Sequence, residues 1–268
     1  HQRRRHYTET TMPQTAELPP DRVAPHRPLA EFYPEPAIRT RFLTELFDHA
    51  APDYDFVSGI MSLWTDRAYR KQALRRAGLA PGMKLLDVAC GTGLVIKAAL
   101  ELGLPPGDIM GVDPSRGMLE QGRRRQGVAL LQGRGERIPA RDGSFDFVSM
   151  GYALRHVEDL RTLFDELHRV LKPGGRLLIM EITRPSSATA RRMMRFYMTR
   201  VMPWVGWVRS RNRFTAKMME YYWATIEECV PPEVILSTLA AANFSEVRRT
   251  TTGPLLSDYL ARKPSASA

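Results

Sequence analysis

Three groups of residues in this sequence have types and spacings that suit the chemistry of a nucleotide-like ligand. The first is a short apolar run that contains Asp87 and ends in the loop Cys90-Gly-Thr-Gly93. The two loop glycines permit a sharp turn and a close ligand approach, and the helix that follows directs its N-terminal N–H groups at the loop. The second is Asp113, twenty residues after the loop, where a carboxylate can accept both hydroxyl groups of a ribose. The third is the pair Gly135-Glu136 after a further strand.

The identity of the ligand depends on the residues around the loop. Dinucleotide-binding proteins share the glycine loop and the later acid, but Ile96 stands where their fingerprint has its third glycine. Asp87 would also repel a pyrophosphate, whereas a carboxylate beside the loop suits a ligand with an ammonium or sulfonium group. S-adenosylmethionine (SAM) has a ribose, a cationic sulfur and no phosphate. We therefore expect SAM as the cofactor, and we expect no metal ion.

Alternating strand and helix patterns must position these groups. Strands are expected at 84–90, 108–113, 128–132, 145–150 and 176–182, and helices at 94–102, 115–126 and 158–171. A further helix from about 231 to 242 precedes two last strands. This order predicts an α/β fold: a Rossmann-like seven-stranded sheet with helices on both faces. An N-terminal helical lid and a helical insertion after the fifth strand complete it.

The chain divides into one domain and two tails. Residues 1–33 have no apolar period and are expected to be a disordered tail, as are residues 263–268. The domain spans 34–262, with the lid at 34–80 and a substrate cap at 185–230. In the lid, an apolar stripe from Ile38 to Leu46 predicts a helix that ends at Pro52, and a basic helix follows at about 65–77.

Residues 42–183 resemble the ubiquinone/menaquinone C-methyltransferase (UbiE/COQ5) family of class I SAM-dependent methyltransferases. The resemblance covers about half of the chain, and the motifs agree in kind, order and spacing. It implies transfer of a methyl group from SAM to a small hydrophobic acceptor, foremost a ring carbon of a prenylated quinol or phenol. The matching pieces are Phe47-Asp-His-Ala-Ala-Pro-Asp-Tyr-Asp55, Leu86-Asp-Val-Ala-Cys-Gly-Thr-Gly93, Gly111-Val-Asp-Pro-Ser-Arg-Gly-Met-Leu119, Glu136-Arg-Ile-Pro139, Ser144-Phe-Asp-Phe147, Leu154-Arg155 and Arg169-Val-Leu-Lys-Pro-Gly-Gly-Arg176.

The resemblance and the strand ends together give the expected site residues. By resemblance, Arg155 orients or activates the base in quinone methylation, and as a permanent cation it would stabilise a phenolate or hold a water base. His156 is a second candidate for the base, because its pKa lies near neutrality. Tyr54, with Asp55, is expected to fold over SAM. The expected cofactor-binding residues are Asp87, Gly91, Thr92, Gly93, Asp113, Met118, Arg134, Gly135, Glu136 and Gly151.

The sequence departs from the family pattern at several of these positions. Arg134 stands where the pattern has Asn or Asp beside the adenine, and Gly151 stands where it has Ser. Ser58 and His156 each replace an Asn. The adenine contacts and the identity of the acceptor therefore stay open.

Composition bounds the partners and the location of the protein. The net charge is +10, and no run of 18 apolar residues exists. Two distant cysteines fit a reducing, cytoplasmic compartment. Residues 191–217 carry eight basic and no acidic residues among many Met and Trp, a mixture that suits an apolar pocket beside an anionic membrane surface. A helical lid whose Met face is ordinary core is the alternative, and the sequence leaves a homodimer open.

The residues leave functions other than quinol methylation open. The cofactor half would equally serve a phospholipid or other small-molecule N- or O-methyltransferase, and the basic charge would suit an RNA or DNA methyltransferase. Against nucleic acid, the fourth strand leads into Met150-Gly-Tyr-Ala153, not into an Asn/Asp-Pro-Pro-Tyr motif, and neither cysteine follows the fourth or fifth strand. No nucleic acid is therefore expected as a partner. A SAM-binding subunit without turnover is the non-enzymatic alternative.

Overall fold

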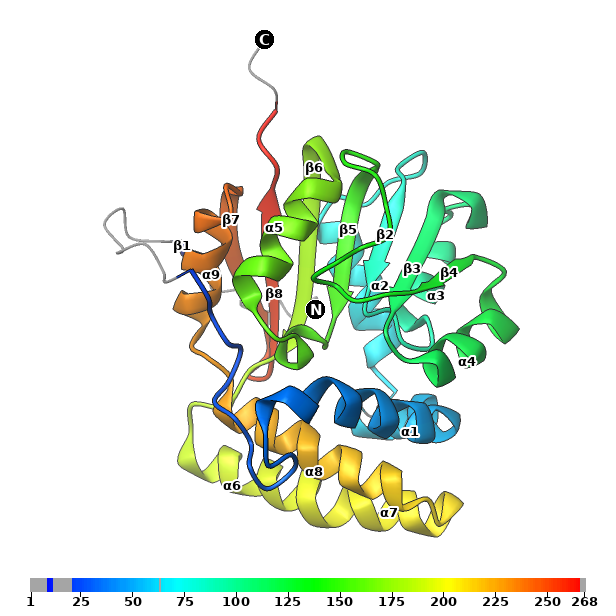
Figure 1. The fold of residues 1–268 in the computed structure, drawn as a ribbon, viewed down its shortest axis with the longest axis vertical. Coiled ribbons are helices and arrows are strands. Elements are labelled where there is room, and N and C mark those ends of the chain that lie inside the picture. Colours follow the sequence, from blue (N-terminus) through cyan, green and yellow to red (C-terminus); the bar gives the residue numbers. More distant parts are fainter. Residues whose placement is uncertain (1–8, 12–20, 63, 266–268) are drawn as a thin grey trace, which may run out of the picture.

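The computed structural model describes residues 9–11, 21–62 and 64–265, and a mixed sheet runs through them (Figure 1). The strand order is β1-β7-β8-β6-β5-β2-β3-β4. Strands β2 to β6 are parallel, and β8 runs antiparallel to β6 and to β7. Seven of these strands are the predicted ones, so the expected fold is confirmed, and β1 is added at one edge. The strands are β1 (Glu9–Thr11), β2 (Leu85–Val88), β3 (Ile109–Asp113), β4 (Ala129–Gln132), β5 (Phe145–Gly151), β6 (Leu171–Ile182), β7 (Ser245–Thr252) and β8 (Leu256–Arg262).

Helices cover both faces of the sheet and also one end of its strands. Residues of α5 and α9 pack in one core cluster, and residues of α2 and α3 pack in another. A third cluster joins α1 to α8, and in Figure 1 these helices lie with α6 and α7 in a layer below the sheet. The helices are α1 (Arg39–Met61), α2 (Asp66–Arg76), α3 (Leu94–Leu100), α4 (Arg116–Gln126), α5 (Leu160–Val170), α6 (Ala188–Phe196), α7 (Met202–Ser210), α8 (Arg213–Glu228) and α9 (Pro232–Ala241).

Helix α1 does not end at Pro52 as predicted, because contacts from other elements serve the backbone groups around the proline. Pro52 has no N–H for the carbonyl of Asp48. That carbonyl faces Gly117 of α4, where a Cβ would lie only 2.6 Å from the oxygen. One residue later, the carbonyl of His49 accepts a hydrogen bond from Nδ2 of Asn212 at 2.8 Å. The helix therefore continues to Met61.

Residues 21–33 differ from the disordered tail expected for this stretch. Val23, Leu29 and Tyr33 are buried, and the backbone N–H of Val23 donates to Asp159 Oδ1 at 2.7 Å. A β-bridge also joins His26 to Cys229. These apolar residues have no regular period, yet each fills a gap beside α5 or α8, a result of tertiary packing that periodicity does not reveal. Residues 1–8 and 12–20 of the expected tail, and 266–268 of the other, lie outside the described residues.

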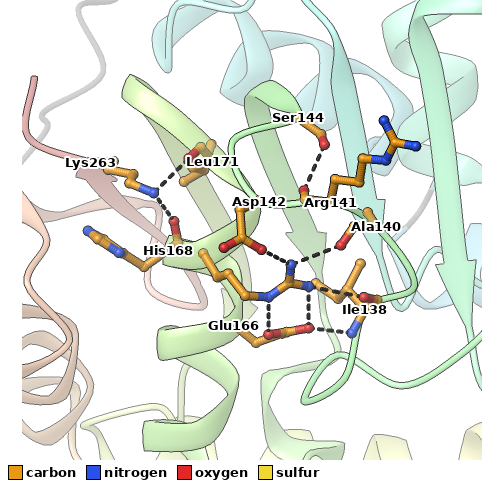
Figure 2. A network of polar contacts seen from close by, with 10 residues as sticks. Ile138, Ala140, Arg141, Asp142, Ser144, Glu166, His168, Leu171 and Lys263 are labelled. Carbon is orange, nitrogen blue, oxygen red and sulfur yellow. Dashed lines mark hydrogen bonds and ion pairs between the residues drawn. The ribbon is translucent and has the colours of Figure 1, made fainter. Parts of the chain in front are cut away.

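A partly exposed polar cluster holds the loop that joins β4 to β5. Arg169 of α5 pairs with Glu166 and Asp142 and donates to the carbonyls of Ile138 and Ala140. In Figure 2 these two carboxylates and two carbonyls surround one guanidinium group. Glu166 also accepts the N–H of Ile138 at 2.6 Å. The loop is therefore tied to α5, and its first residues, which border the site, have a rigid support.

Candidate functional site

A cavity of about 850 Å³, its open mouth included, lies where the parallel strands end. Its walls come from the loops after β2, β4 and β5 and from the end of β3, and α1 forms its roof through Leu43 and Phe47. We call it the first cavity. The sequence-predicted residues that line it are Tyr54, Gly91, Asp113, Met118, Arg134, Gly135, Glu136, Gly151 and His156.

Asp113 has the geometry expected for a ribose-binding carboxylate. Its Oδ2 accepts the N–H of Gly91 and its Oδ1 accepts that of Ser115, each at 2.8 Å. Burial raises the pKa of Asp113 to about 6. Each carboxylate oxygen can accept a second hydrogen bond. The carboxylate is thus held in one orientation with acceptor capacity remaining for the hydroxyls of a nucleoside.

In the glycine loop, the side chain of Thr92 contacts the lid helix α1 and not the cavity. Gly91 and Gly93 adopt positive φ angles of 57° and 84°, which an L-residue with a Cβ rarely adopts. Between them, the hydroxyl of Thr92 donates to Asp55 of α1. Thr92 and Gly93 were expected to contact the cofactor, but they do not line the cavity. Thr92 instead anchors the roof of the cavity to its floor.

A second anchor joins α1 to the start of α4. Asp48 Oδ1 accepts the hydroxyl of Ser115 at 2.6 Å and the N–H of Gly117 at 2.8 Å. Ser115 is itself the N-cap of α4 and accepts the N–H of Met118. A carboxylate near a helix N-terminus is favoured by the orphan N–H groups and the helix dipole. The two anchors hold α1 against the first cavity, and Tyr54 of this helix lines it.

Asp87 lies behind the loop and not in the cavity wall. Its side chain is fully buried within β2, and its Oδ1 accepts the hydroxyl of Ser149 at 2.7 Å. Burial raises the pKa of Asp87 to about 7. Its role toward the cationic part of the cofactor stays a prediction.

The loop after β4 forms one side of the first cavity through paired charges. Arg134 pairs with Glu158 at 2.9 Å and with Glu136 at 3.5 Å, and Glu136 accepts the N–H of Glu158 at 2.8 Å. A Cβ on Gly135 would lie 2.8 Å from Leu163 Cδ1, so a larger residue here would require the side chain of Leu163 to shift. Glu136 is therefore a paired wall residue and not a solvated loop carboxylate.

His156 lies in an aromatic niche of the first cavity. Its ring centroid is 5.3 Å from those of Phe47 and Tyr222 and 5.5 Å from that of Tyr221. Burial, and next to it the charge of Arg155, holds the pKa of His156 well below its ordinary value. Both ring nitrogens are buried without a hydrogen-bond partner among the described residues. The ring is therefore neutral, with two unused polar atoms.

Arg155 is fully buried behind this niche. It forms an ion pair with Glu181 of β6, and its Nε donates to Thr225 at 3.3 Å. Its Cζ lies 5.4 Å from the ring centroid of Tyr222. Burial lowers the pKa of this guanidinium group. Arg155 is not among the residues that line either of the two cavities described here, so its predicted contact with a phenolate stays a prediction.

A second cavity, of about 1020 Å³ with its mouth, adjoins the first. Tyr54, Tyr152 and Tyr222 line both and form a shared wall, in which the hydroxyls of Tyr54 and Tyr222 lie 3.0 Å apart. The rest of the second cavity comes from the lid, from the predicted cap and from the β7–β8 turn. Its apolar lining residues are Met61, Ile182, Met194, Pro254, Leu255 and Leu256.

Most lining residues of the second cavity are not among the site residues that the sequence predicts. Two polar ones are Asp66, which begins the basic helix α2, and Tyr152, which directly follows the expected Gly151. The available signal was the single acid at the start of a basic helix and the aromatic residue at a strand end.

The residues of the first cavity fit SAM. Asp113 supplies a fixed carboxylate for a ribose, and no atom lies within 4 Å of a Cβ placed on Gly91, so the loop is open to a ligand. Met118 and Gly135 also line this cavity. Bound SAM would supply an electrophilic methyl group on its sulfur.

Known proteins similar to this chain agree with this assignment. The ubiE/COQ5 methyltransferase family matches residues 37–253. A demethylmenaquinone methyltransferase of Symbiobacterium thermophilum is 35% identical over 223 residues, 80% of this chain and 88% of that protein. One of Lactococcus lactis is 34% identical over 67% of this chain and 71% of its own length.

Solved structures share the fold at lower identity. A SAM-dependent methyltransferase from Thermotoga maritima superposes with a TM-score of 0.58 at 20% identity, over 82% of this chain and 99% of that one. A phosphoethanolamine N-methyltransferase of Haemonchus contortus, in complex with SAM, gives 0.55 at 18% identity over 74% of this chain and 52% of that one. The sequence relatives carry the assignment further than these folds do: the chain is a SAM-dependent methyltransferase and belongs to the ubiE/COQ5 methyltransferase family.

Proposed function

We propose that this protein methylates a ring carbon of a hydrophobic quinol or phenol that binds in the second cavity. The observation that carries the proposal is the shared wall of Tyr54, Tyr152 and Tyr222 between a nucleoside-binding cavity and a largely apolar one. Aromatic side chains with hydroxyl groups suit a flat, phenolic ligand. The relatives named demethylmenaquinone methyltransferase support an acceptor of this class.

The residues of the shared wall would orient the acceptor and exclude water. Methylation at carbon requires the acceptor hydroxyl to lose its proton, because the electron pair left on oxygen raises the electron density of the ortho carbon. Burial raises the pKa of Tyr54, so Tyr54 stays a neutral phenol that can donate to the acceptor oxygen. A closed wall also holds the reacting atoms near 3–3.5 Å, the distance that a direct transfer needs.

In this proposal the other two catalytic candidates, Arg155 and His156, do not contact the acceptor. Arg155 holds the ring of Tyr222 through its guanidinium face and is therefore a positioning residue. His156 lines the first cavity and not the second, so its unused ring nitrogens would contact the cofactor side of the reaction.

A peripheral contact with an anionic membrane would give access to a lipid-like acceptor. Large apolar side chains on α6 and α7 are exposed, with exposed fractions of 63% for Phe196 and 63% for Trp204. Arg192, Arg195 and Arg200 lie in the same region beside a shallow surface pocket. None of the described helices is long and apolar enough to cross a membrane. Apolar and basic side chains on one helical layer suit binding at an interface.

Vesicle binding tests this contact. Vesicles that contain phosphatidylglycerol should retain the protein, and Phe196→Ser with Trp204→Ser should lower retention. The control is Leu131→Ser, which removes an exposed apolar side chain from edge strand β4. Equal retention of the double variant and the control would refute the contact.

Labelled SAM tests the acceptor class. The protein is incubated with labelled SAM and, in parallel, with demethyl-quinols, phospholipids and tRNA. We expect label in a quinol, attached at carbon by mass spectrometry. Label confined to phospholipid would favour N- or O-methylation, and label confined to tRNA would refute a small-molecule acceptor.

A further inference from the structure

A single carboxylate lines the second cavity among the described residues, and it belongs to Asp66. Its side chain is 12% exposed. Oδ1 accepts the hydroxyl of Tyr152 at 3.1 Å, and Oδ2 accepts Nε of Arg70 at 2.7 Å. Both carboxylate oxygens therefore have a fixed direction, and one of them is joined to a tyrosine of the shared wall.

Tyr152 is held in a conformation that costs free energy. Its φ angle is +59°, in the left-handed region, which is an outlier for a bulky residue. Its N–H donates to the carbonyl of Met180 at 2.7 Å, and its ring lies 4.7 Å from Arg70 Cζ. Strain of this kind costs about 1–3 kcal/mol and is concentrated at functional sites. The strain places the phenol between the two cavities with its hydroxyl on Asp66.

Arg70 is buried beside Tyr152 because the neighbouring residue has no side chain. A Cβ on Gly151 would lie 2.9 Å from Nη1 of Arg70. The departure from Ser to Gly at this position therefore makes room for the guanidinium group. Arg70 is buried and lines neither cavity, and its ion pair compensates the negative charge of Asp66.

The other titratable groups around Asp66 do not serve as a proton acceptor. Those that face it are Arg70 on its own helix, Tyr152 after β5 and Tyr54 of α1. Burial is the main cause that raises the pKa of both tyrosines, so they are neutral phenols. Arg70 is a permanent cation. Tyr69 also lines the cavity, but its hydroxyl donates to Asp258.

We propose that Asp66 is the general base of the methyl transfer and that it receives the proton of the acceptor hydroxyl through Tyr152. The inference rests on the proposed function, since it requires a phenolic acceptor in the second cavity. The acceptor O–H bond breaks, and its proton bonds to the oxygen of Tyr152 while the proton of Tyr152 passes to Asp66 Oδ1. The electron pair of the broken bond stays on the acceptor oxygen and activates the ring carbon.

Two variants and a control test the relay. Asp66→Asn keeps the shape of the side chain but cannot take a proton, and Tyr152→Phe removes the relay while it leaves the Asp66–Arg70 pair intact. Each should lower kcat for quinol methylation by about 10²- to 10⁴-fold, the usual contribution of a general base. SAM affinity by calorimetry should stay the same. The control is Glu101→Gln. It removes an ion-pair partner of Arg67, which lies on the same helix α2 as Asp66, and it should keep full activity.

A second readout does not depend on turnover. Para-nitrophenol changes its visible absorbance when it ionises, so its titration while bound to the protein without SAM reports the polar groups that act on a phenol in the second cavity. Wild-type protein should ionise the bound probe at a higher pH than Asp66→Asn or Tyr152→Phe does, because Tyr152 accepts from the neutral phenol and the carboxylate of Asp66 opposes a second negative charge. The same titration in all three proteins, or wild-type kcat in both variants, would overturn the relay.

The two proposals can fail separately. If wild-type protein methylates no quinol or phenol, the proposed function fails, and the probe titration still decides whether Asp66 and Tyr152 act on a phenol in the second cavity. If wild-type protein and both variants methylate a quinol equally, the proposed function stands and the relay fails.

Discussion

Gly117 offers the most direct test of how α1 is held over the first cavity. Its Cα belongs to the first turn of α4, and a Cβ there would lie 2.6 Å from the carbonyl oxygen of Asp48 and 2.9 Å from the Cα of Asp48. Both atoms belong to the backbone of α1, so no rotamer change can relieve the contact. Gly117→Ala therefore requires α1 and α4 to separate by roughly 1 Å, because the attraction between non-bonded atoms is optimal only at 3.5–4.0 Å.

The cost of this separation follows from the contacts that it disturbs. Overpacking of this kind costs about 1–3 kcal/mol, and the separation also stretches both hydrogen bonds to the carboxylate of Asp48. Within α4, alanine regains up to about 1 kcal/mol of helix propensity relative to glycine. The two terms oppose each other in global stability, so unfolding is a poor readout. The affinity for SAM is a better one, because it depends on the closed position of α1.

Calorimetry of SAM binding is the assay. If closure of α1 loses about 1–3 kcal/mol, the dissociation constant should rise about 5- to 150-fold, with every 1.4 kcal/mol equal to tenfold. The matched control is Gly107→Ala, where a Cβ would meet no atom within 4 Å. An equal SAM affinity of the two variants would refute the view that α1 must dock on α4 for the cofactor to bind.

Three further predictions concern buried charges. Asp113→Ala should abolish SAM binding by calorimetry, and in wild-type protein the affinity should fall as the pH drops below about 6, where Asp113 takes a proton. Burial raises the pKa of Asp87 from about 3.8 in the unfolded chain to about 7 in the folded one, so the folded state holds an extra proton between these values. The unfolding free energy should therefore fall as the pH rises through this window. Because Asp113 contributes in the same direction only up to about pH 6, Asp87→Asn should remove the part of the fall between about pH 6 and 7 in urea titrations. Arg155→Ala should destabilise the protein by about 3–5 kcal/mol because it strands the buried carboxylate of Glu181, whereas Arg155→Met with Glu181→Gln should regain most of the stability and not the turnover, which denaturation and labelled-SAM assays would check.

The cofactor half of the site could be predicted from the sequence because its signals are local. A strand that ends in a glycine loop and a strand that ends at Asp113 place the loop and the carboxylate at one edge of a parallel sheet. The structure brings Gly91 and Asp113 within one hydrogen bond of 2.8 Å. No distant residue is needed for this arrangement.

The acceptor half could not be predicted in the same way, because it depends on which charges become buried. Arg70 and Asp66 form an i,i+4 pair, which in sequence is typical of a solvated helix face. They are buried because α2 packs where Gly151 leaves room for a guanidinium group. Arg155 likewise became a structural ion-pair residue through Glu181, a partner on another strand. No local sequence pattern predicts that the Asp66–Arg70 pair is buried or that Arg155 pairs with Glu181.

The predicted boundaries of the lid were wrong for a related reason. Pro52 is a strong local signal for a helix end, but the side chain of Asn212 and the open surface at Gly117 accommodate the carbonyls of the preceding turn. Residues 21–33 lack a period and still bury Leu29 and Tyr33 almost completely. In both cases tertiary contacts from distant segments outweigh the local preference.

Helix α1 also links the two halves of the site in one rigid element. Asp48 and Asp55 anchor it to the cofactor side, and Tyr54, next to Asp55, forms part of the wall that both cavities share. A displacement of α1 relative to α8 would change both cavities, because the hydroxyls of Tyr54 and Tyr222 lie 3.0 Å apart in the shared wall. A cofactor beneath α1 and an acceptor in the second cavity therefore depend on the same helix, and a change at either anchor is expected to affect both.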